Sequence, residues 1–348
     1  MGKRLIAMVL VLINVISLTS CGITKTKRYE AEFLVLFDTV TKIVGYADSK
    51  EEFDKNAHMI YDELKIYHEL YDIYNDYDGI NNIKTINENA GIKPVKVDKK
   101  LIDMLLYAKE AYKETDGKLN IALGAVLQVW HQYREEGINN PDNAKVPPMK
   151  LLKEKNKHTD INNLIINEKD STVFLKDPEM SLDVGGVGKG YATEQVCQYA
   201  QAHGFVNGMV SVGGNVRVIG SRDGKGEPWH VGIQNPDLTS EKTNLKILNL
   251  TDASLVSSGD YERYYMVDGV KYHHIIDPVT LMPSTYFTAV TIVCKDSGMA
   301  DAYTKAIYNM PYEDGLQFVE KHPEIEALWV FKNGDLKYSP GFEKYIRE

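Results

Sequence analysis

Residues 181–191 read SLDVGGVGKGY and combine four glycines with the carboxylate of Asp183 and the ammonium of Lys189. Glycines let a backbone approach a ligand and present its N–H groups, and a helix that starts just beyond them favours an anion. The stretch therefore predicts a phosphate cradle between a strand and a helix. It lacks the Gly-Lys-Ser/Thr ending of a P-loop and the GxGxxG spacing of a dinucleotide site. A tight turn without a ligand is the alternative interpretation.

The first residues of the chain read as a targeting signal. A basic start at Lys3 and Arg4 precedes a nearly continuous apolar run over residues 5–18, which is too short to cross a bilayer comfortably. The ending Leu-Thr-Ser-Cys at residues 18–21 resembles a bacterial lipobox. We therefore expect a signal peptide at 1–20, a lipid on Cys21 and a tether at 21–30, which would anchor the protein on the outer face of the cytoplasmic membrane. An ordinary signal peptide cut near Ser20 is the alternative.

Composition and charge limit the classes of protein to which this chain can belong. The net charge of -9 argues against nucleic-acid binding. After Cys21 only Cys197 and Cys294 remain, so the sequence predicts no disulfide framework, and it shows no CxxC or His-rich metal spacing. Residues 31–348 are long enough to form a single folded domain with a sizeable core.

The periodicity predicts an α+β fold that is helix-rich in its N-terminal part and strand-rich in its C-terminal part. We expect a loop over 75–91, a hairpin over 164–175 and a closing hairpin over 327–339. Helices are expected at 51–74, 101–115, 121–136, 191–203, 300–308 and 312–320. Strands are expected at 209–212, 216–219, 230–233, 245–248, 254–257, 264–267, 274–276 and 289–293.

Four further motifs carry residues suited to catalysis. They read SVGGN (211–215), SSGDYER (257–263), HHIIDP (273–278) and DSGMAD (296–301). Taken singly, His274 could be a buried structural imidazole, Asp277 a turn former and Asp301 a helix cap. Together, glycine loops, a lysine, a histidine and acidic loops suit a magnesium-dependent reaction on a nucleotide.

These motifs resemble those of the ApbE-type FAD:protein FMN transferases. The resemblance runs from about residue 33 to residue 338. It is most specific at SLDVGGVGKGYA (181–192), SVGGNVRVIG (211–220), SSGDYERYY (257–265), HHIIDPVT (273–280) and SGMADA (297–302), and it includes TDGKLNIALGAVLQVWH (115–131).

The resemblance implies an ApbE-like fold around a central FAD cleft, and it implies the reaction. Such enzymes cleave the FAD pyrophosphate with the help of Mg2+, release AMP and attach FMN by a phosphoester to a Thr or Ser of an acceptor protein. Redox proteins outside the cytoplasmic membrane are the acceptors that the resemblance implies.

The resemblance also assigns roles to residues. Asp301 is the expected metal carboxylate, Gly186 the expected carbonyl ligand, and His274 a general base or a phosphate-orienting group. Flavin and pyrophosphate contacts are expected from Asp183, Gly185, Gly186, Lys189, Gly214, Ser258, Gly259, Asp260, His274, Ile275 and Ile276.

Three positions depart from the family pattern. Lys305 occupies the place of a metal-binding threonine, and Thr304 lies one residue earlier, about 100° around a helix, where it cannot simply substitute. Asn120 stands where an aspartate is usual, and Phe37-Asp38-Thr39 stands where Met-Gly-Thr is common. We therefore expect either a water in place of the threonine or an ammonium that partly replaces the metal charge. An FAD pyrophosphatase that yields FMN and AMP, and a non-catalytic FAD-binding lipoprotein, are the alternative functions.

Overall fold

The structure is a computed structural model that describes residues 26–347. The expected signal peptide at 1–20 and the lipidation site at Cys21 lie outside the described residues. The first strand, β1, spans Lys27–Phe33. The expected tether at 21–30 is therefore corrected, because its last residues pair with the second strand and belong to the fold.

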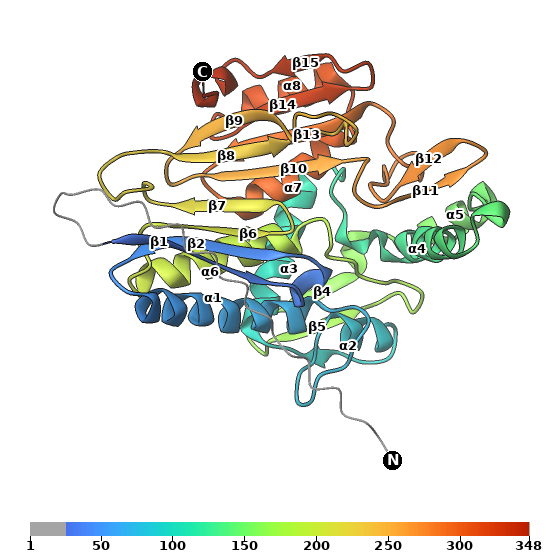
Figure 1. Ribbon diagram of the computed structural model, residues 1–348. Helices are drawn as coiled ribbons and strands as arrows, with labels where there is room; N and C mark the ends of the chain where they lie inside the picture. The colour runs from blue at the N-terminus through green and yellow to red at the C-terminus, as the bar shows by residue number, and fades with distance from the viewer. Residues whose placement is uncertain (1–25, 348) are drawn as a thin grey trace.

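One antiparallel sheet of eight strands forms the centre of the molecule, in the order β1-β2-β6-β7-β10-β13-β14-β15 (Figure 1). Its first and last strands in sequence lie far apart, because β1 and β15 are the two edges. The strands after β1 are β2 (Thr41–Ala47), β6 (Gly208–Val212), β7 (Asn215–Ile219), β10 (Ser254–Gly259), β13 (Phe287–Cys294), β14 (Glu326–Phe331) and β15 (Leu336–Tyr338).

Helices cover one face of this sheet and bury most of the apolar core (Figure 1). Helix α1 shows how the sequence builds this layer: Ser49 caps its start, and Phe53, Ile60 and Leu64 recur on the buried side. The helices that pack together here are α1 (Lys50–Tyr71), α3 (Lys99–Glu114), α6 (Gly188–Ala202), α7 (Ser297–Tyr308) and α8 (Tyr312–Lys321).

A hairpin covers part of the other face. Strands β8 (Trp229–Gln234) and β9 (Asn244–Leu250) pair antiparallel. Their side chains Trp229, Val231 and Leu248 pack with sheet residues in a second apolar cluster. The sheet is thus buried on both sides, which explains why β7 is buried at every position.

A smaller lobe holds α4 (Gly124–Asn139), α5 (Met149–Lys155) and the hairpin of β11 (Tyr264–Val267) with β12 (Val270–His273), all at one side of Figure 1. Trp130, Leu152 and Tyr265 form its apolar centre. A three-stranded sheet, ordered β3-β5-β4, contains β3 (Val95–Lys96), β4 (Leu164–Asn167) and β5 (Thr172–Leu175). Within residues 26–347, no helix has the length and apolarity needed to cross a membrane.

The α+β class and the predicted helices and hairpins are confirmed. The loop expected over 75–91 is wrong in part, because it contains helix α2 (Ile83–Glu88). Asn82 and Thr85 form a capping box there, and Ile83 and Ile86 are buried. The strands β1 and β2 were not predicted.

The strand expected at 274–276 is wrong. Strand β12 ends at His273, and Ile276 makes only an isolated bridge to Pro283. The His274 N–H still donates to the Arg263 carbonyl at 3.0 Å, and a turn follows at Asp277, whose carboxylate accepts a hydrogen bond from the Val279 N–H at 3.0 Å. Residues 274–276 lie between the hairpin and this turn, on the wall of a cleft.

Candidate functional site

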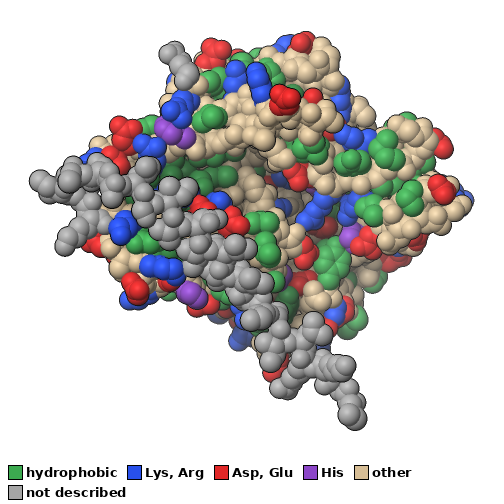
Figure 2. Space-filling view, in the orientation of Figure 1, with side chains coloured by type: hydrophobic (Ala, Val, Ile, Leu, Met, Phe, Trp, Pro, Cys, Tyr) green, Lys and Arg blue, Asp and Glu red, His purple; other side chains and the backbone are tan. Residues whose placement is uncertain are grey.

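A cleft of about 820 Å³ opens on one face of the molecule and gathers the motifs that the sequence singled out. Figure 2 shows the hollow on this face, with Lys, Arg and His side chains in and beside it. The site residues expected from the sequence that line it are Asp183, Gly185, Gly186, Lys189, Gly214, Ser258, Gly259, His274, Ile275, Ile276 and Lys305. Segments more than 120 residues apart in the chain, such as those of Asp183 and Lys305, therefore meet at one ligand-sized space.

Three expected residues do not line the cleft. Asp260 is buried behind the wall, where its carboxylate pairs with Lys271 at 3.3 Å and with Lys332 at 2.5 Å. Asp301 and Thr304 are fully buried within α7. Asp260 therefore holds the wall together through ion pairs, and a contact with flavin is not the role that its position favours.

The glycine stretch forms the end of the cleft at the start of α6. Asp183 Oδ1 accepts a hydrogen bond from the Gly185 N–H at 2.8 Å, which closes the turn. Helix α6 then begins at Gly188 with no side-chain cap, and Lys189 lies in its first turn. An uncapped helix start with a lysine beside it attracts an anion.

The second glycine turn, between β6 and β7, forms another part of the wall. Gly213 and Gly214 have φ angles of 55° and 86°, which glycine adopts without strain. The turn brings Asn215 to the end of β7, where its Nδ2 donates to Asp301 Oδ2 at 2.9 Å. The turn is thus linked directly to α7.

Asp301 is held by donors on three different elements. Besides Asn215, the Gly190 N–H donates to Oδ2 at 2.8 Å, and Lys305 Nζ lies 2.8 Å from Oδ1. Burial alone would raise the pKa of Asp301, but the charges of Lys305 and Lys189 outweigh it and lower that pKa. The carboxylate is therefore ionised and paired inside the protein.

Lys305 extends from α7 to the cleft, whereas Thr304 turns back to its own helix. The Thr304 hydroxyl donates to the Ala300 carbonyl at 2.5 Å, so it does not face the site. A Cβ built on Gly186 would lie 3.8 Å from Lys305 Cγ, which places the lysine stem beside the glycine stretch. This outcome agrees with the expectation that Thr304 cannot replace a ligand at position 305.

His274 lies on the cleft wall among cations. Burial is the main cause that holds its pKa well below the usual value, and Lys305 and Lys189 lower it further. The ring is therefore neutral at neutral pH. Its Nδ1 lies 3.3 Å from the Arg263 carbonyl oxygen, which can only accept a hydrogen bond, so Nδ1 is the donor. A neutral ring that donates from Nδ1 keeps a free lone pair on Nε2, which is the state of a general base.

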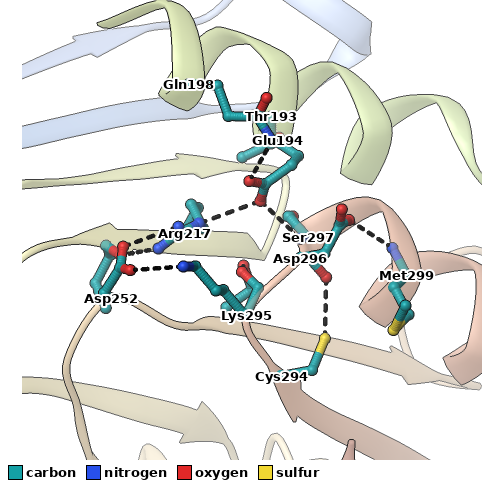
Figure 3. Close-up of polar contacts among 12 residues, drawn as sticks. Thr193, Glu194, Gln198, Arg217, Asp252, Cys294, Lys295, Asp296, Ser297 and Met299 are labelled. Atoms are coloured by element: carbon teal, nitrogen blue, oxygen red, sulfur yellow. Dashed lines mark hydrogen bonds and ion pairs between the residues drawn. The ribbon is translucent and has the colours of Figure 1, made fainter. Parts of the chain in front are cut away.

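A buried polar network fixes α6 relative to α7 (Figure 3). Glu194 Oε2 accepts hydrogen bonds from Arg217 Nε at 3.1 Å and from the Ser297 N–H at 2.9 Å. Arg217 also donates to Asp252 Oδ1 at 2.9 Å. One carboxylate on α6 thereby sets the start of α7, and hence the distance from Lys189 to Lys305.

Gly190 allows the two helices to approach this closely. A Cβ at this position would collide with Asp301 Cβ and with the Ser297 carbonyl oxygen. Since only glycine fits at this crossing, Gly190 of the 181–191 stretch is required by helix packing.

Three buried polar atoms of the cleft have no hydrogen-bond partner within residues 26–347. They are Tyr71 Oη, Ser258 Oγ and Asn309 Oδ1. A buried polar atom without a partner costs free energy, so atoms of this kind on a cleft wall favour a polar ligand. The cavity volume, these atoms and the anion-binding end fit a dinucleotide such as FAD.

Sequence reasoning missed Tyr71, Arg134 and Asn309 as cleft residues. Arg134 lies one helical turn after His131, and its Nη2 is 2.7 Å from His131 Nδ1. This i,i+3 spacing just beyond the recognised 115–131 segment was the available signal. Tyr71 is the last residue of α1 and Asn309 directly follows α7, and no local pattern marks either of them.

The residues around Asp301 do not fit a magnesium ion. Across the described residues, no group of three or more His, Cys, Asp or Glu side chains could hold a metal. Both Asp301 oxygens already accept hydrogen bonds, one of them from an ammonium, and the Thr304 hydroxyl points away. Mg2+ binds proteins through one or two carboxylates together with substrate phosphates, and the single carboxylate here is already occupied by two N–H donors and an ammonium.

Comparison with known proteins is consistent with the geometry. The ApbE family model matches residues 37–329. A curated FAD:protein FMN transferase of Treponema pallidum is 32% identical over 278 residues, which cover 76% of this chain and 75% of the relative. The crystal structure of the ApbE protein from Thermotoga maritima superposes with a TM-score of 0.80 at 30% identity, over 92% of this chain and 100% of that chain. The flavin transferase ApbE from Vibrio cholerae shares the fold, with a TM-score of 0.74 at 24% identity over 92% and 99% of the two chains.

Proposed function

The chain belongs to the ApbE family, and we propose that it is an FAD:protein FMN transferase. It moves FMN from FAD to a Thr or Ser hydroxyl of an acceptor protein and releases AMP. The observation that carries this proposal is the position of neutral His274 in the same cleft as Lys189 and Lys305, beside the start of α6. A base, a paired set of cations and an anion-binding helix end are the parts that phosphoryl transfer needs.

The cleft divides the tasks of the reaction among its walls. Lys189 and the N-terminus of α6 bind the pyrophosphate, and Ile275 and Ile276 provide apolar surface for a ring. His274 Nε2 takes the proton of the acceptor hydroxyl. The hydroxyl oxygen then bonds to the phosphorus of the FMN half. The bond from that phosphorus to the bridging oxygen breaks, and AMP leaves with that oxygen.

Magnesium was expected with this reaction, but the donor set at Asp301 does not fit it, so none of these steps is assigned to a metal. The acceptor is proposed to be a redox protein outside the cytoplasmic membrane. The lipobox-like residues 18–21 support a lipid on Cys21, which would hold the enzyme on the outer face of that membrane.

The test combines purified protein, FAD and a Thr-bearing acceptor domain that another ApbE-family transferase is able to flavinylate. Covalent flavin fluorescence on the acceptor in a denaturing gel, with one AMP formed per flavin attached, supports transfer. AMP and free FMN without a fluorescent acceptor would instead identify a pyrophosphatase. FAD binding without AMP would identify a non-catalytic binding protein. The second transferase provides the positive control for the acceptor.

A further inference from the structure

We infer that Lys305 is the resident cation of the phosphoryl transfer, so that the reaction proceeds without a divalent metal ion. This inference rests on the proposed function, because it assigns the charge that neutralises the FAD pyrophosphate. It concerns one side chain, its buried partner Asp301 and the glycine stretch beside them.

Lys305 lines the cleft while its ammonium is held by a buried carboxylate. Its Nζ lies 2.8 Å from Asp301 Oδ1, and its side chain is 16% exposed while that of Asp301 is fully buried. The lysine is thus anchored at its tip by a buried carboxylate and still lines the cleft. A cation held in this way is ordered before the substrate binds, which is the condition for strong electrostatic stabilisation.

Both carboxylate oxygens of Asp301 already have partners within the protein. Its Oδ2 accepts hydrogen bonds from Gly190 and Asn215, and its Oδ1 faces the Lys305 ammonium. A divalent ion on this carboxylate would stand beside that ammonium and be repelled by it. The carboxylate therefore serves as counter-ion to a lysine in this chain.

The glycine stretch contains Lys189 and lies beside Lys305. A Cβ added at Gly186 would lie 3.8 Å from Lys305 Cγ, so the Lys305 stem lies beside the glycine stretch, and Lys305 lines the same cleft as Lys189. Lys189 has no salt-bridge partner among residues 26–347, and burial lowers its pKa although Asp301 opposes that effect. Lys189 and Lys305 thus place two ammonium groups on one wall of the cleft, where a pyrophosphate diester can contact both, while Asp301 remains the counter-ion of Lys305.

Lys305 acts on the negative charge that develops during the transfer. As the acceptor oxygen attacks the phosphorus of the FMN half, negative charge grows on its non-bridging oxygens and on the bridging oxygen that leaves with AMP. The Lys305 ammonium stabilises that charge without transferring a proton, and the hydroxyl proton still passes to His274. Lys305 thereby supplies the Lewis-acid role by charge alone.

The direct test uses the unmodified full chain. FMN transfer is measured in EDTA and with added Mg2+, and the inference expects rates that agree within about twofold. Loss of transfer in EDTA with recovery in Mg2+ would overturn it. FAD affinity, measured by quenching of flavin fluorescence under both conditions, is likewise expected to be unchanged. A metal requirement for binding would also count against the inference.

Variants at position 305 provide the second test. In EDTA, Lys305→Thr is expected to transfer FMN about 10²-fold more slowly, since that is the effect of removing one preorganised charge donor. Lys305→Arg, which keeps the positive charge, is expected to retain more activity than Lys305→Thr. Equal rates for Lys305→Thr and the unmodified chain would contradict the role.

Folding is controlled by a double variant. Lys305→Met alone leaves Asp301 buried without its cation, which destabilises the fold. Asp301→Asn combined with Lys305→Met removes both charges, and circular dichroism checks that this protein is folded. It is expected to bind FAD about 10-fold or more weakly than the unmodified chain in EDTA. Equal affinity would overturn the inference.

The two proposals fail in different ways. If no acceptor is labelled under any condition, transfer is wrong, and the FAD affinities in EDTA still decide whether Lys305 neutralises the pyrophosphate. If labelling occurs only with Mg2+, transfer stands and the resident-cation inference falls.

Discussion

Glu194 Oε2 and Arg217 Nε lie 3.1 Å apart in a salt bridge whose side chains are only 5% and 2% exposed. The same carboxylate oxygen accepts the N–H of Ser297 at the start of α7. This pair therefore links the helix that carries Lys189 to the helix that carries Lys305, through the sheet strand between them.

Breaking this pair should destabilise the protein. Arg217→Met leaves Glu194 buried and uncompensated, which is expected to lower the free energy of unfolding by about 3–5 kcal/mol. Urea denaturation followed by circular dichroism measures the change. The double variant Glu194→Gln with Arg217→Met removes both charges and should recover part of the loss. A single variant as stable as the unmodified chain would show that the pair is unimportant.

His274→Ala should separate binding from chemistry. We expect FAD affinity close to that of the unmodified chain and a transfer rate lowered by about 10²–10⁴-fold, because a general base is removed while the cations remain. Fluorescence quenching gives the affinity, and acceptor labelling gives the rate. His203→Ala is the matched control, since His203 lies exposed at the end of α6. Similar transfer rates for His274→Ala and His203→Ala would show that His274 is not the general base.

The free energy of unfolding should depend on pH through the lowered pKa of His274. Burial keeps the ring neutral in the folded protein, whereas an unfolded histidine takes up a proton near pH 6.5. Below about 6.5 the unfolded state therefore binds more protons, so this residue makes the free energy of unfolding fall as the pH falls. Urea denaturation on both sides of that pH, with His274→Gln as reference, measures the contribution. An equal slope in the variant would contradict it.

The activity profile provides a companion readout. The His274 ring stays neutral at pH values below the ordinary histidine pKa. Its titration should therefore cause no fall in the transfer rate near pH ~6.5. A decline there that disappears in His274→Gln would contradict the lowered pKa.

Gly190→Ala should disrupt the crossing of α6 and α7. The added methyl group would meet Asp301 Cβ and the Ser297 carbonyl oxygen, so overpacking is expected to cost about 1–3 kcal/mol and to weaken FAD binding. The control is Gly315→Ala in α8, where the new Cβ would lie at least 3.5 Å from its neighbours. A helical glycine with room for a methyl group should gain about 0.5–1 kcal/mol on substitution. Thermal unfolding of both variants measures the contrast, and losses of equal size would refute it.

Cys21→Ser should release the protein from the membrane. If Cys21 carries the lipid, the unmodified protein fractionates with membranes, while the variant is found in the soluble fraction. Immunoblotting of fractionated cells measures the distribution, with Cys197→Ser as the control because Cys197 is buried in the core. An unmodified protein that is soluble would refute the anchor.

Much of the fold was readable because its helices carry clear apolar stripes and caps, as α1 shows with Ser49, Phe53 and Ile60. The edge strand β1 was not predicted, although Tyr29, Ala31 and Phe33 of its sequence KRYEAEF alternate with glutamates; its charged residues favoured the interpretation as a tether. Helix α2 was missed for another reason: the loop-forming residue Asn82 acts there as a helix cap.

The site was predictable as a set of motifs, and its geometry was not. The sequence placed Asp260 in a motif of the pocket, but it could not show that the side chain turns to Lys271 and Lys332. Position 305 could be singled out from the sequence, yet the pairing of Lys305 with Asp301 depends on the buried side of α7, which only tertiary packing defines.

The four-residue spacing from Asp301 to Lys305 gives a rule for sorting related genes. Both residues lie on one helix, one turn apart, so the amino acid at the second position can be found in any relative without a structure. A lysine at that position would identify enzymes in which a side chain, and not a metal ion, supplies the positive charge for the transfer. Such enzymes would remain active in habitats where a host withholds metals. A hydroxyl residue there would mark enzymes that must compete for their ions.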